Sequence, residues 1–305
     1  MRQLIPSGFN LTSKIFEINN ELFVMIPKNA SNTILYGTSF SADYKNFNEV
    51  DKQHKGVNVF IRDPISRFKA GLVESIKRCS PFVIDNYVAS RSSVPTSSDI
   101  NFIYTNILEQ LHNDSKKFIS NILEILSCSF YDPHLCPQWY FFTSLDCKTI
   151  LDIKMFLLDD LENVMSSLNL RIDRSYNISS SFDTEQFAIQ KYNNPKKKLK
   201  QVLQRKSKIM NKILTNLIFK FNSNSLYCQK SLEPVFNFIS YQKWSQAKDI
   251  IYKTINEDEE LKSHIRSLYK IDCNIYNNLI RNKSLILPKD FNLHLMNENI
   301  NPLIN

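Results

Sequence analysis

The feature that most constrains the fold is the stretch from Phe23 to Thr33, FVMIPKNASNT. An apolar run of strand length ends at Pro27, and a lysine and small polar residues follow. Such residues mark a turn after a strand. A helix that begins in this turn presents unpaired backbone N–H groups and the positive end of its dipole, which attract an anion. Lys28 adds a charge and Ser31 and Thr33 add hydroxyl donors, so the stretch predicts a phosphate-binding turn.

This turn is not one of the common glycine-rich nucleotide loops. The chain has only four glycines, and they are too widely spaced for GxGxxG or GxxxxGK[ST]. We predict a strand over about 21–26 before the turn and a helix over about 31–40 after it. On this stretch alone, an ordinary strand-turn-helix corner with a solvated lysine stays open, because short motifs often match by chance.

A second stretch has the same organisation. The apolar run Val57–Ile61 predicts a buried strand over 57–62, and Arg62, Asp63 and Pro64 follow it. Asp63 suits the N-cap of a helix, and Pro64 suits its first position. Arg62 therefore lies where a strand ends, on the rim that carries ligands in open α/β sheets.

The two stretches together resemble a known pair of motifs. PKNASNT (27–33) and VFIRDPISRF (59–68) resemble the cofactor-binding segments of sulfotransferases, and most closely those of carbohydrate sulfotransferases. These enzymes use 3′-phosphoadenosine 5′-phosphosulfate (PAPS) as the sulfate donor. The resemblance implies an α/β fold with a P-loop-like parallel sheet flanked by helices and a largely helical C-terminal part. We expect one domain over 1–305 with a polar and basic insertion at about 177–210.

The resemblance assigns roles to particular residues. It implies that Lys28 contacts the 5′-phosphate and the bridging oxygen of the leaving group, and that Arg62 binds the 3′-phosphate. The loop after Lys28 is expected to hold the 5′-phosphosulfate through hydroxyls and backbone N–H groups, with these residues: Asn29, Ala30, Ser31, Asn32 and Thr33.

Two departures from the family pattern affect these assignments. Ala30 stands where the family often has glycine, so we expect the loop to form there without a positive φ. Ala70 stands where the family tends to have a serine that binds the 3′-phosphate. Ser66, one helical turn earlier, is the predicted substitute, and Lys69 is the alternative.

Sulfuryl transfer also needs a base for the acceptor hydroxyl, a contribution of typically about 10²–10⁴-fold. The segment 131–140, YDPHLCPQWY, looks like the D-x-H-x-x-P-Q segment of the same relatives. We predict that His134 is the base, oriented by Asp132 or by a backbone carbonyl, since neutral imidazole suits this role near neutral pH. A histidine held in a loop by hydrogen bonds is the alternative reading, and His54 and Glu74 are weaker candidates. The chemistry needs no metal, and we expect none.

Composition limits the partners without identifying them. The formal net charge is +8, which suits an anionic donor but also nucleic acid or an acidic glycan. We expect a hydroxyl acceptor on a glycan or glycoconjugate, and no nucleic acid.

No apolar run approaches the ~18 residues of a membrane span, and no signal peptide is recognisable. We therefore expect no stable membrane insertion and a cytoplasmic protein. The six cysteines form no CxxC pair, which indicates free, mostly buried thiols.

Three other functions stay open. One is a degenerate sulfotransferase fold that only binds its ligand, which Ala70 in place of the family serine keeps possible. A nucleotide-dependent phosphotransferase needs a Mg²⁺-binding carboxylate at the end of a core strand, and Asp159 or Asp160 is the candidate. A basic nucleic-acid-binding protein is favoured by the net charge and by the lysines over 196–208, although these also suit a solvated helix face.

The rest of the chain is mostly helical in its pattern. Helical periodicity predicts that Phe68 and Leu72 face the sheet and that Arg67 faces solvent or the ligand. We expect an edge strand over 15–18 that pairs near the first motif. The further elements expected are a strand within 149–158, a helix over 161–168 capped by Asp160, helices over about 100–112, 115–127, 233–254 and 257–281, and a tail over 283–305.

Overall fold

The structure is a computed structural model that describes residues 15–38, 40, 43–45, 50, 56–77, 109–128, 134–144, 146–172 and 241–296. The chain divides into two compact units, and each is described by itself. The helical unit takes in described residues 69–77, 109–128, 134–135 and 241–264, and the sheet unit takes in the other described residues. The predicted insertion at 177–210 lies outside the described residues.

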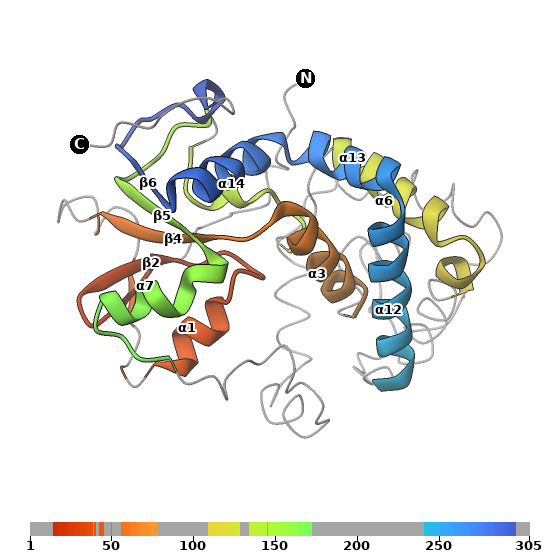
Figure 1. Ribbon diagram of the computed structural model, residues 1–305, viewed down its shortest axis with the longest axis horizontal. Coiled ribbons are helices and arrows are strands. Elements are labelled where there is room, and N and C mark those ends of the chain that lie inside the picture. Colours follow the sequence, from red (N-terminus) through yellow and green to blue (C-terminus); the bar gives the residue numbers. More distant parts are fainter. Residues whose placement is uncertain are drawn as a thin grey trace, which may run out of the picture. The chain divides into compact units, whose positions relative to one another are not determined.

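The sheet unit contains six strands in the order β3-β1-β2-β4-β5-β6 (Figure 1). They are β1 (Ile15–Ile18), β2 (Glu21–Val24), β3 (Asp43–Lys45), β4 (Val57–Ile61), β5 (Ile153–Leu157) and β6 (Ser284–Leu287). The central strands β2, β4 and β5 are parallel, and the outer strands pair antiparallel. The expected α/β class is confirmed, but the sheet is mixed and only its centre is parallel.

Two expectations about the sheet edges were wrong. The strand predicted over 15–18 does pair with β2, but β3 covers its other side, so β1 is not an edge strand. The expected tail after Lys283 begins with β6, which pairs with β5. Within β6, Leu285 and Leu287 are buried and alternate with exposed residues. This alternation over four residues is too short to separate a strand from an apolar stretch of loop.

A tight turn between β1 and β2 explains why these strands form a hairpin. Ile18 pairs with Glu21, which leaves Asn19 and Asn20 as a two-residue loop. Both have positive φ, 50° and 66°, as the favoured hairpin turn requires. Asparagine tolerates this left-handed conformation better than most residues.

One face of the sheet is lined by a ladder of aromatic rings. Phe16, Phe23, Phe60 and Phe156 come from four successive strands, with ring centroids 5.6, 6.4 and 5.8 Å apart. Cross-strand aromatic pairs of this kind stabilise a sheet. The short helices α1 (Ser31–Gly37) and α7 (Leu161–Ser167) cover this face, while α14 (Lys270–Asn282) lies on the other side (Figure 1).

The helix after β4 begins as its sequence predicts. Helix α3 (Pro64–Lys77) has proline at its first position. The Oδ2 atom of Asp63 accepts a hydrogen bond of 2.7 Å from the N–H of Ser66, which is the bond of an N-cap. This part of the prediction is confirmed. By contrast, Asp160 precedes α7 but its side chain makes no capping bond.

Three of the other predicted helices are present with changed limits, and the helix predicted over about 100–112 lies mostly outside the described residues. The helix predicted over 115–127 is α6 (Ser115–Cys128), whose buried apolar residues are Phe118, Ile119, Ile122, Leu123 and Leu126. The C-terminal helices are α12 (Tyr241–Glu257) and α13 (Glu259–Leu268), followed by α14. The helix predicted over 257–281 is thus divided at Tyr269, whose φ of −105° and ψ of 33° break the helical backbone. Single-turn 3-10 helices are η1 (Gln138–Phe141), η2 (Leu158–Asp160) and η4 (Leu293–Leu295).

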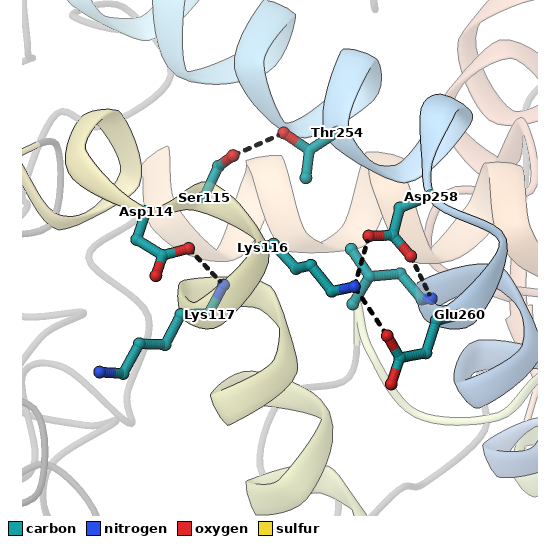
Figure 2. Close-up of polar contacts among 8 residues, drawn as sticks. Asp114, Ser115, Lys116, Lys117, Thr254, Asp258 and Glu260 are labelled. Carbon is teal, nitrogen blue, oxygen red and sulfur yellow. Dashed lines mark hydrogen bonds and ion pairs between the residues drawn. The ribbon is translucent and has the colours of Figure 1, made fainter.

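Polar contacts join α6 to the C-terminal helices within the helical unit (Figure 2). The hydroxyls of Ser115 and Thr254 are 2.8 Å apart. The Lys116 ammonium lies 2.9 Å from Asp258 and 2.7 Å from Glu260, and hydrogen bonds to Glu260 and Asp258 raise the pKa of Lys116 to about 12. Asp258 also accepts from the N–H of Leu261 and so caps α13. These contacts are solvent-exposed, so we expect them to orient the helices rather than to add much stability.

Among the described residues, none of the helices has the length and apolar character needed to cross a membrane.

Gly71 sets the distance between α3 and the turn that carries His134. A Cβ atom on Gly71 would lie 2.2 Å from the carbonyl oxygen of His134, far inside van der Waals contact. A Cβ atom on Gly56, by contrast, would lie 3.7 Å from the nearest atom, the carbonyl oxygen of Asp152.

We predict that Gly71→Ala lowers the free energy of unfolding by about 1–3 kcal/mol, because the backbone of the turn must move. At a helix position with open space around it, glycine to alanine raises the free energy of unfolding by about 1 kcal/mol. The sign of the measured change therefore shows whether the close approach at Gly71 exists. Urea unfolding measures the effect, and Gly56→Ala is the matched control, with an expected change within about 0.5 kcal/mol. Stabilisation by Gly71→Ala would show that the close approach does not exist.

Candidate functional site

Lys28 and Arg62 lie on neighbouring loops at one edge of the sheet. Strands β2 and β4 are parallel neighbours, so the loops that follow them leave the sheet at the same edge. The Nη1 atom of Arg62 donates a 3.1 Å hydrogen bond to the carbonyl oxygen of Lys28, across 34 positions of sequence. Both side chains are half-buried. Two cationic residues are thus brought together at the edge where this class of fold binds ligands.

Asn29 is part of the interior rather than of the exposed loop surface. It is 3% exposed. Its Nδ2 atom donates to the carbonyl oxygen of Phe60 at 2.7 Å and to the Oε1 atom of Gln138. Among the described residues its Oδ1 atom has no hydrogen-bond partner. The Asn29 side chain therefore ties the loop to β4, and its backbone N–H is also used within the turn, where it donates to the carbonyl oxygen of Ile26 at 3.1 Å.

The Ser31 hydroxyl is also used within the loop. It is buried and donates a 2.6 Å hydrogen bond to the carbonyl oxygen of Ile26, which closes the turn between β2 and α1. Thr33 is half-buried in α1, and Asn32 lies in the same helix. Since α1 has only seven residues, its dipole is a minor source of positive potential. The roles of Ser31, Asn32 and Thr33 toward a phosphosulfate stay predictions.

The expectation that Ala30 avoids a positive φ was wrong. Ala30 has φ 55° and ψ 17°, the left-handed conformation that glycine would adopt at no cost. Lys28 also has a positive φ, 71°, while Asn29 between them does not. An alternation of this kind turns successive backbone N–H groups toward a common point, as in anion-binding concavities. Here the N–H of Asn29 is already bonded to the carbonyl oxygen of Ile26, so the N–H groups that follow it would have to bind the anion. The loop therefore has a left-handed backbone, of the kind glycine favours, at an alanine.

Ser66 lies in the first turn of α3, close in sequence to Arg62 and to Asp63, the N-cap of this helix. Its side chain is half-exposed, and its N–H is held by Asp63. Ala70 follows one helical turn later on the same face of the helix. The position of Ser66 is compatible with the predicted substitution for the missing serine, which stays a prediction.

Gln138, which the sequence did not single out, connects the two loops. It is fully buried at the start of η1. Its Oε1 atom accepts a 2.9 Å hydrogen bond from the N–H of Arg62, and its Nε2 atom donates at 2.9 Å to the carbonyl oxygen of the same residue. The same Oε1 atom accepts from Asn29. The signal in the sequence was the P-Q pair of the segment that drew attention to His134.

Arg67 and Asp272 are two buried charged residues near Gln138 that interact electrostatically. The prediction that Arg67 faces solvent or ligand was wrong, since it is 1% exposed and donates to the carbonyl oxygen of Cys136. Asp272, also 1% exposed, accepts from the N–H of Gln138 at 2.7 Å and of Trp139 at 3.1 Å. Burial raises the pKa of Asp272 to about 6, against the opposing field of Arg67 and these N–H groups. Burial likewise lowers the pKa of Arg67.

His134, the predicted base, belongs to the helical unit, whereas Lys28 and Arg62 belong to the sheet unit. Its backbone carbonyl faces Gly71 of α3. Glu74, a weaker candidate, also lies in the helical unit. Asp132 and His54 lie outside the described residues. The role of His134 as the base therefore stays a prediction.

Cysteine and metal chemistry add little to the site. Cys136 and Cys147 are buried and Cys273 is half-buried, and none of the three forms a disulfide, which confirms the expected thiol state for these residues. Within the described ranges, no three His, Cys, Asp or Glu side chains gather in a way that suits a metal ion.

Comparison of the chain with protein-family models, with curated proteins and with solved structures gave no match. The function is therefore argued from the geometry of the site and from the resemblance of the two loop segments.

Ala30→Gly tests the strained loop. We predict that it raises the free energy of unfolding by up to about 1 kcal/mol, because the left-handed conformation costs about 1–2 kcal/mol for alanine and part of this gain is lost to the entropy of glycine. Urea unfolding measures it. Ala70→Gly removes the same methyl group from an ordinary helical position and should instead cost about 0.5–1 kcal/mol. Equal losses in both variants would contradict a left-handed Ala30.

Asp272→Asn tests the buried pair through its pH dependence. The pKa of Asp272 in the fold, about 6, lies above its ordinary value of 3.8. The folded state therefore binds the proton more tightly, and the contribution of Asp272 to stability increases as the pH falls through 6. We predict that the stability advantage of wild type over Asp272→Asn is about 1 kcal/mol larger at about pH 5 than at about pH 7.

Urea unfolding at the two pH values measures this advantage. Asp272→Asn replaces one of the two oxygens that accept the N–H groups of Gln138 and Trp139 by an NH2 group, and at about pH 7 it also leaves Arg67 without its counter-charge, so it should cost about 3–5 kcal/mol there. Arg67→Met/Asp272→Asn, which removes both charges, is the control and should recover part of this loss. An advantage that is equal at both pH values, or larger at about pH 7, would contradict the raised pKa.

Proposed function

We propose that this protein is a sulfotransferase that moves the sulfuryl group of PAPS to an acceptor hydroxyl, with a carbohydrate as the expected acceptor. The observation that carries the proposal is the hydrogen bond from Arg62 to the carbonyl oxygen of Lys28. It joins the two residues that the resemblance assigns to opposite ends of one doubly phosphorylated adenosine. The P-loop-like character of the sheet belongs to the same proposal.

The donor set of the site fits such an anion. The alternating signs of φ at Lys28, Asn29 and Ala30 suit a concavity of backbone N–H groups for the 5′-phosphosulfate. The Lys28 ammonium supplies positive charge as the phosphate leaves, where preorganised charge is most effective. Arg62, with Ser66 one turn into α3, is assigned to the 3′-phosphate and holds the donor in line.

The acceptor side is assigned to His134. Its imidazole would take the proton of the acceptor hydroxyl as the oxygen attacks sulfur, while the nucleotide leaves as 3′-phosphoadenosine 5′-phosphate. Acceptor pockets in such folds come from variable loops and helices, and the acceptor class that we propose is a hydroxyl on a glycan or glycoconjugate.

A nucleotide-dependent phosphotransferase is the second candidate, because of one observation. Asp159 and Asp160 lie in η2, directly after β5, which is the parallel neighbour of β4. They are therefore at the same edge as Arg62, where a Mg²⁺ ligand would be needed. The lysines over 196–208, on which the nucleic-acid alternative rests, lie outside the described residues.

Calorimetry with 3′-phosphoadenosine 5′-phosphate tests the proposal. We expect wild type to bind, and we expect Lys28→Ala and Arg62→Ala each to weaken binding at least about tenfold, or about 1.4 kcal/mol. The reason is that each variant removes one cation from one phosphate. Arg171→Ala is the matched control, since Arg171 is an exposed cation of the sheet unit just beyond α7, and it should bind like wild type. Unchanged affinity in both site variants would remove the assignment.

Donor dependence separates the two candidate enzymes. A sulfotransferase labels its acceptor from PAPS without added Mg²⁺ and does not use ATP, whereas a phosphotransferase needs ATP and Mg²⁺. Asp159→Asn should leave the first activity nearly intact and abolish the second.

A further inference from the structure

The side chain of Gln138 hydrogen-bonds to the backbone of Arg62 in the way that a residue of a neighbouring strand would. Its side-chain amide accepts from the N–H of Arg62 and donates to the carbonyl oxygen of the same residue, both at 2.9 Å. Arg62 is the first residue after β4, so no strand residue holds it by regular pairing. The amide of Gln138 thus extends the sheet by one residue and fixes the point from which the Arg62 side chain leaves.

The same amide oxygen holds the loop that carries Lys28. It accepts from the Nδ2 atom of Asn29, which also donates to the carbonyl oxygen of Phe60. Because both partners of Nδ2 are acceptors, the orientation of the Asn29 amide is determined by its contacts. Arg62 in turn donates to the carbonyl oxygen of Lys28. These bonds close a ring through Lys28, Asn29, Gln138 and Arg62.

The backbone of Gln138 is itself anchored by a hydrogen bond to Asp272. Its N–H donates to Asp272, as does the N–H of Trp139, and Asp272 lies in the field of the buried Arg67. Pro137 precedes it with φ −52°, which the proline ring fixes. With its backbone anchored and its side chain fully buried, Gln138 has little freedom to adjust if either loop moves.

We propose that Gln138 is the positioning residue of this site: it sets the distance between Lys28 and Arg62, and so the ability of the pair to hold both phosphates of one nucleotide. The inference rests on the proposed function. Gln138 touches no ligand in this scheme, and it acts only through the two cationic residues. A residue with a purely structural role would change stability alone and would leave the affinity of the folded protein as it was.

Gln138→Met is the main variant, because methionine has the same length and none of the hydrogen bonds. Gln138→Asn, which keeps the amide but is one methylene shorter, is the milder second variant. Gln246→Met is the matched control, since Gln246 is exposed in α12. Circular dichroism first confirms that each full-length variant is folded, and calorimetry then measures 3′-phosphoadenosine 5′-phosphate binding.

We expect Gln138→Met to lose at least about tenfold in affinity although Lys28 and Arg62 are both present, and Gln246→Met to lose none. A double-mutant cycle with Arg62→Ala is the decisive readout. If Gln138 acts through Arg62, then Arg62→Ala/Gln138→Met loses less than the product of the two single losses. The proposal would be overturned by a double variant whose loss of affinity equals the product of the two single losses, or by a folded Gln138 variant with wild-type affinity. So would failure of both Gln138 variants to fold, because Gln138 would then be required for the fold itself.

Amide hydrogen exchange separates this proposal from the proposed function. If wild type does not bind the nucleotide, the proposed function fails, and the exchange of the Arg62 N–H decides whether Gln138 places this residue. Faster exchange at Arg62 in Gln138→Met, with unchanged exchange in α14, would support the placement. Unchanged exchange at Arg62 would overturn it.

Discussion

The buried carboxylate of Asp272 is the interaction on which the rest of the site depends. Moving a carboxylate out of water costs several kcal/mol, and the loss is offset only by good partners. Here the N–H groups of Gln138 and Trp139 and the nearby charge of Arg67 offset only part of the cost, since burial still raises the pKa of Asp272 to about 6. Asp272 lies on α14 and Arg67 at the start of α3. Asp272 therefore links α14 to the η1 segment through two hydrogen bonds, and it interacts electrostatically with Arg67.

This anchoring explains what the sequence could and could not predict. The strands and helices around the site follow from apolar runs, prolines and caps, and parallel pairing of β2 and β4 puts Lys28 near Arg62. Arg67 and Asp272 could not be placed in this way, because local periodicity assigns charged residues to the solvent. Their burial depends on each other across about two hundred positions, and pairing at that distance leaves no local pattern.

Ala30 shows a second limit of local reasoning. Its residue type argues against a left-handed backbone, yet three bonds around it leave little choice. The N–H of Asn29 donates to the carbonyl oxygen of Ile26, as does the Ser31 hydroxyl, and the N–H of Ile34 donates to Ala30. The turn is set by its neighbours, and Ala30 bears the strain. Backbone strain of this kind is often found at functional sites, where the surroundings hold it in place.

The same bonds decide which groups are left to bind an anion. The amide of Asn29 and the hydroxyl of Ser31 are both directed into the fold, so the neutral side chains of this loop build its shape. Charge and backbone N–H groups then have to supply the binding, and the charges are those of Lys28 and Arg62. Because a charge attracts over a longer distance than a hydroxyl and is less directional, what the loop must control is the separation of the two cations. That separation is set by residues that the ligand need never touch.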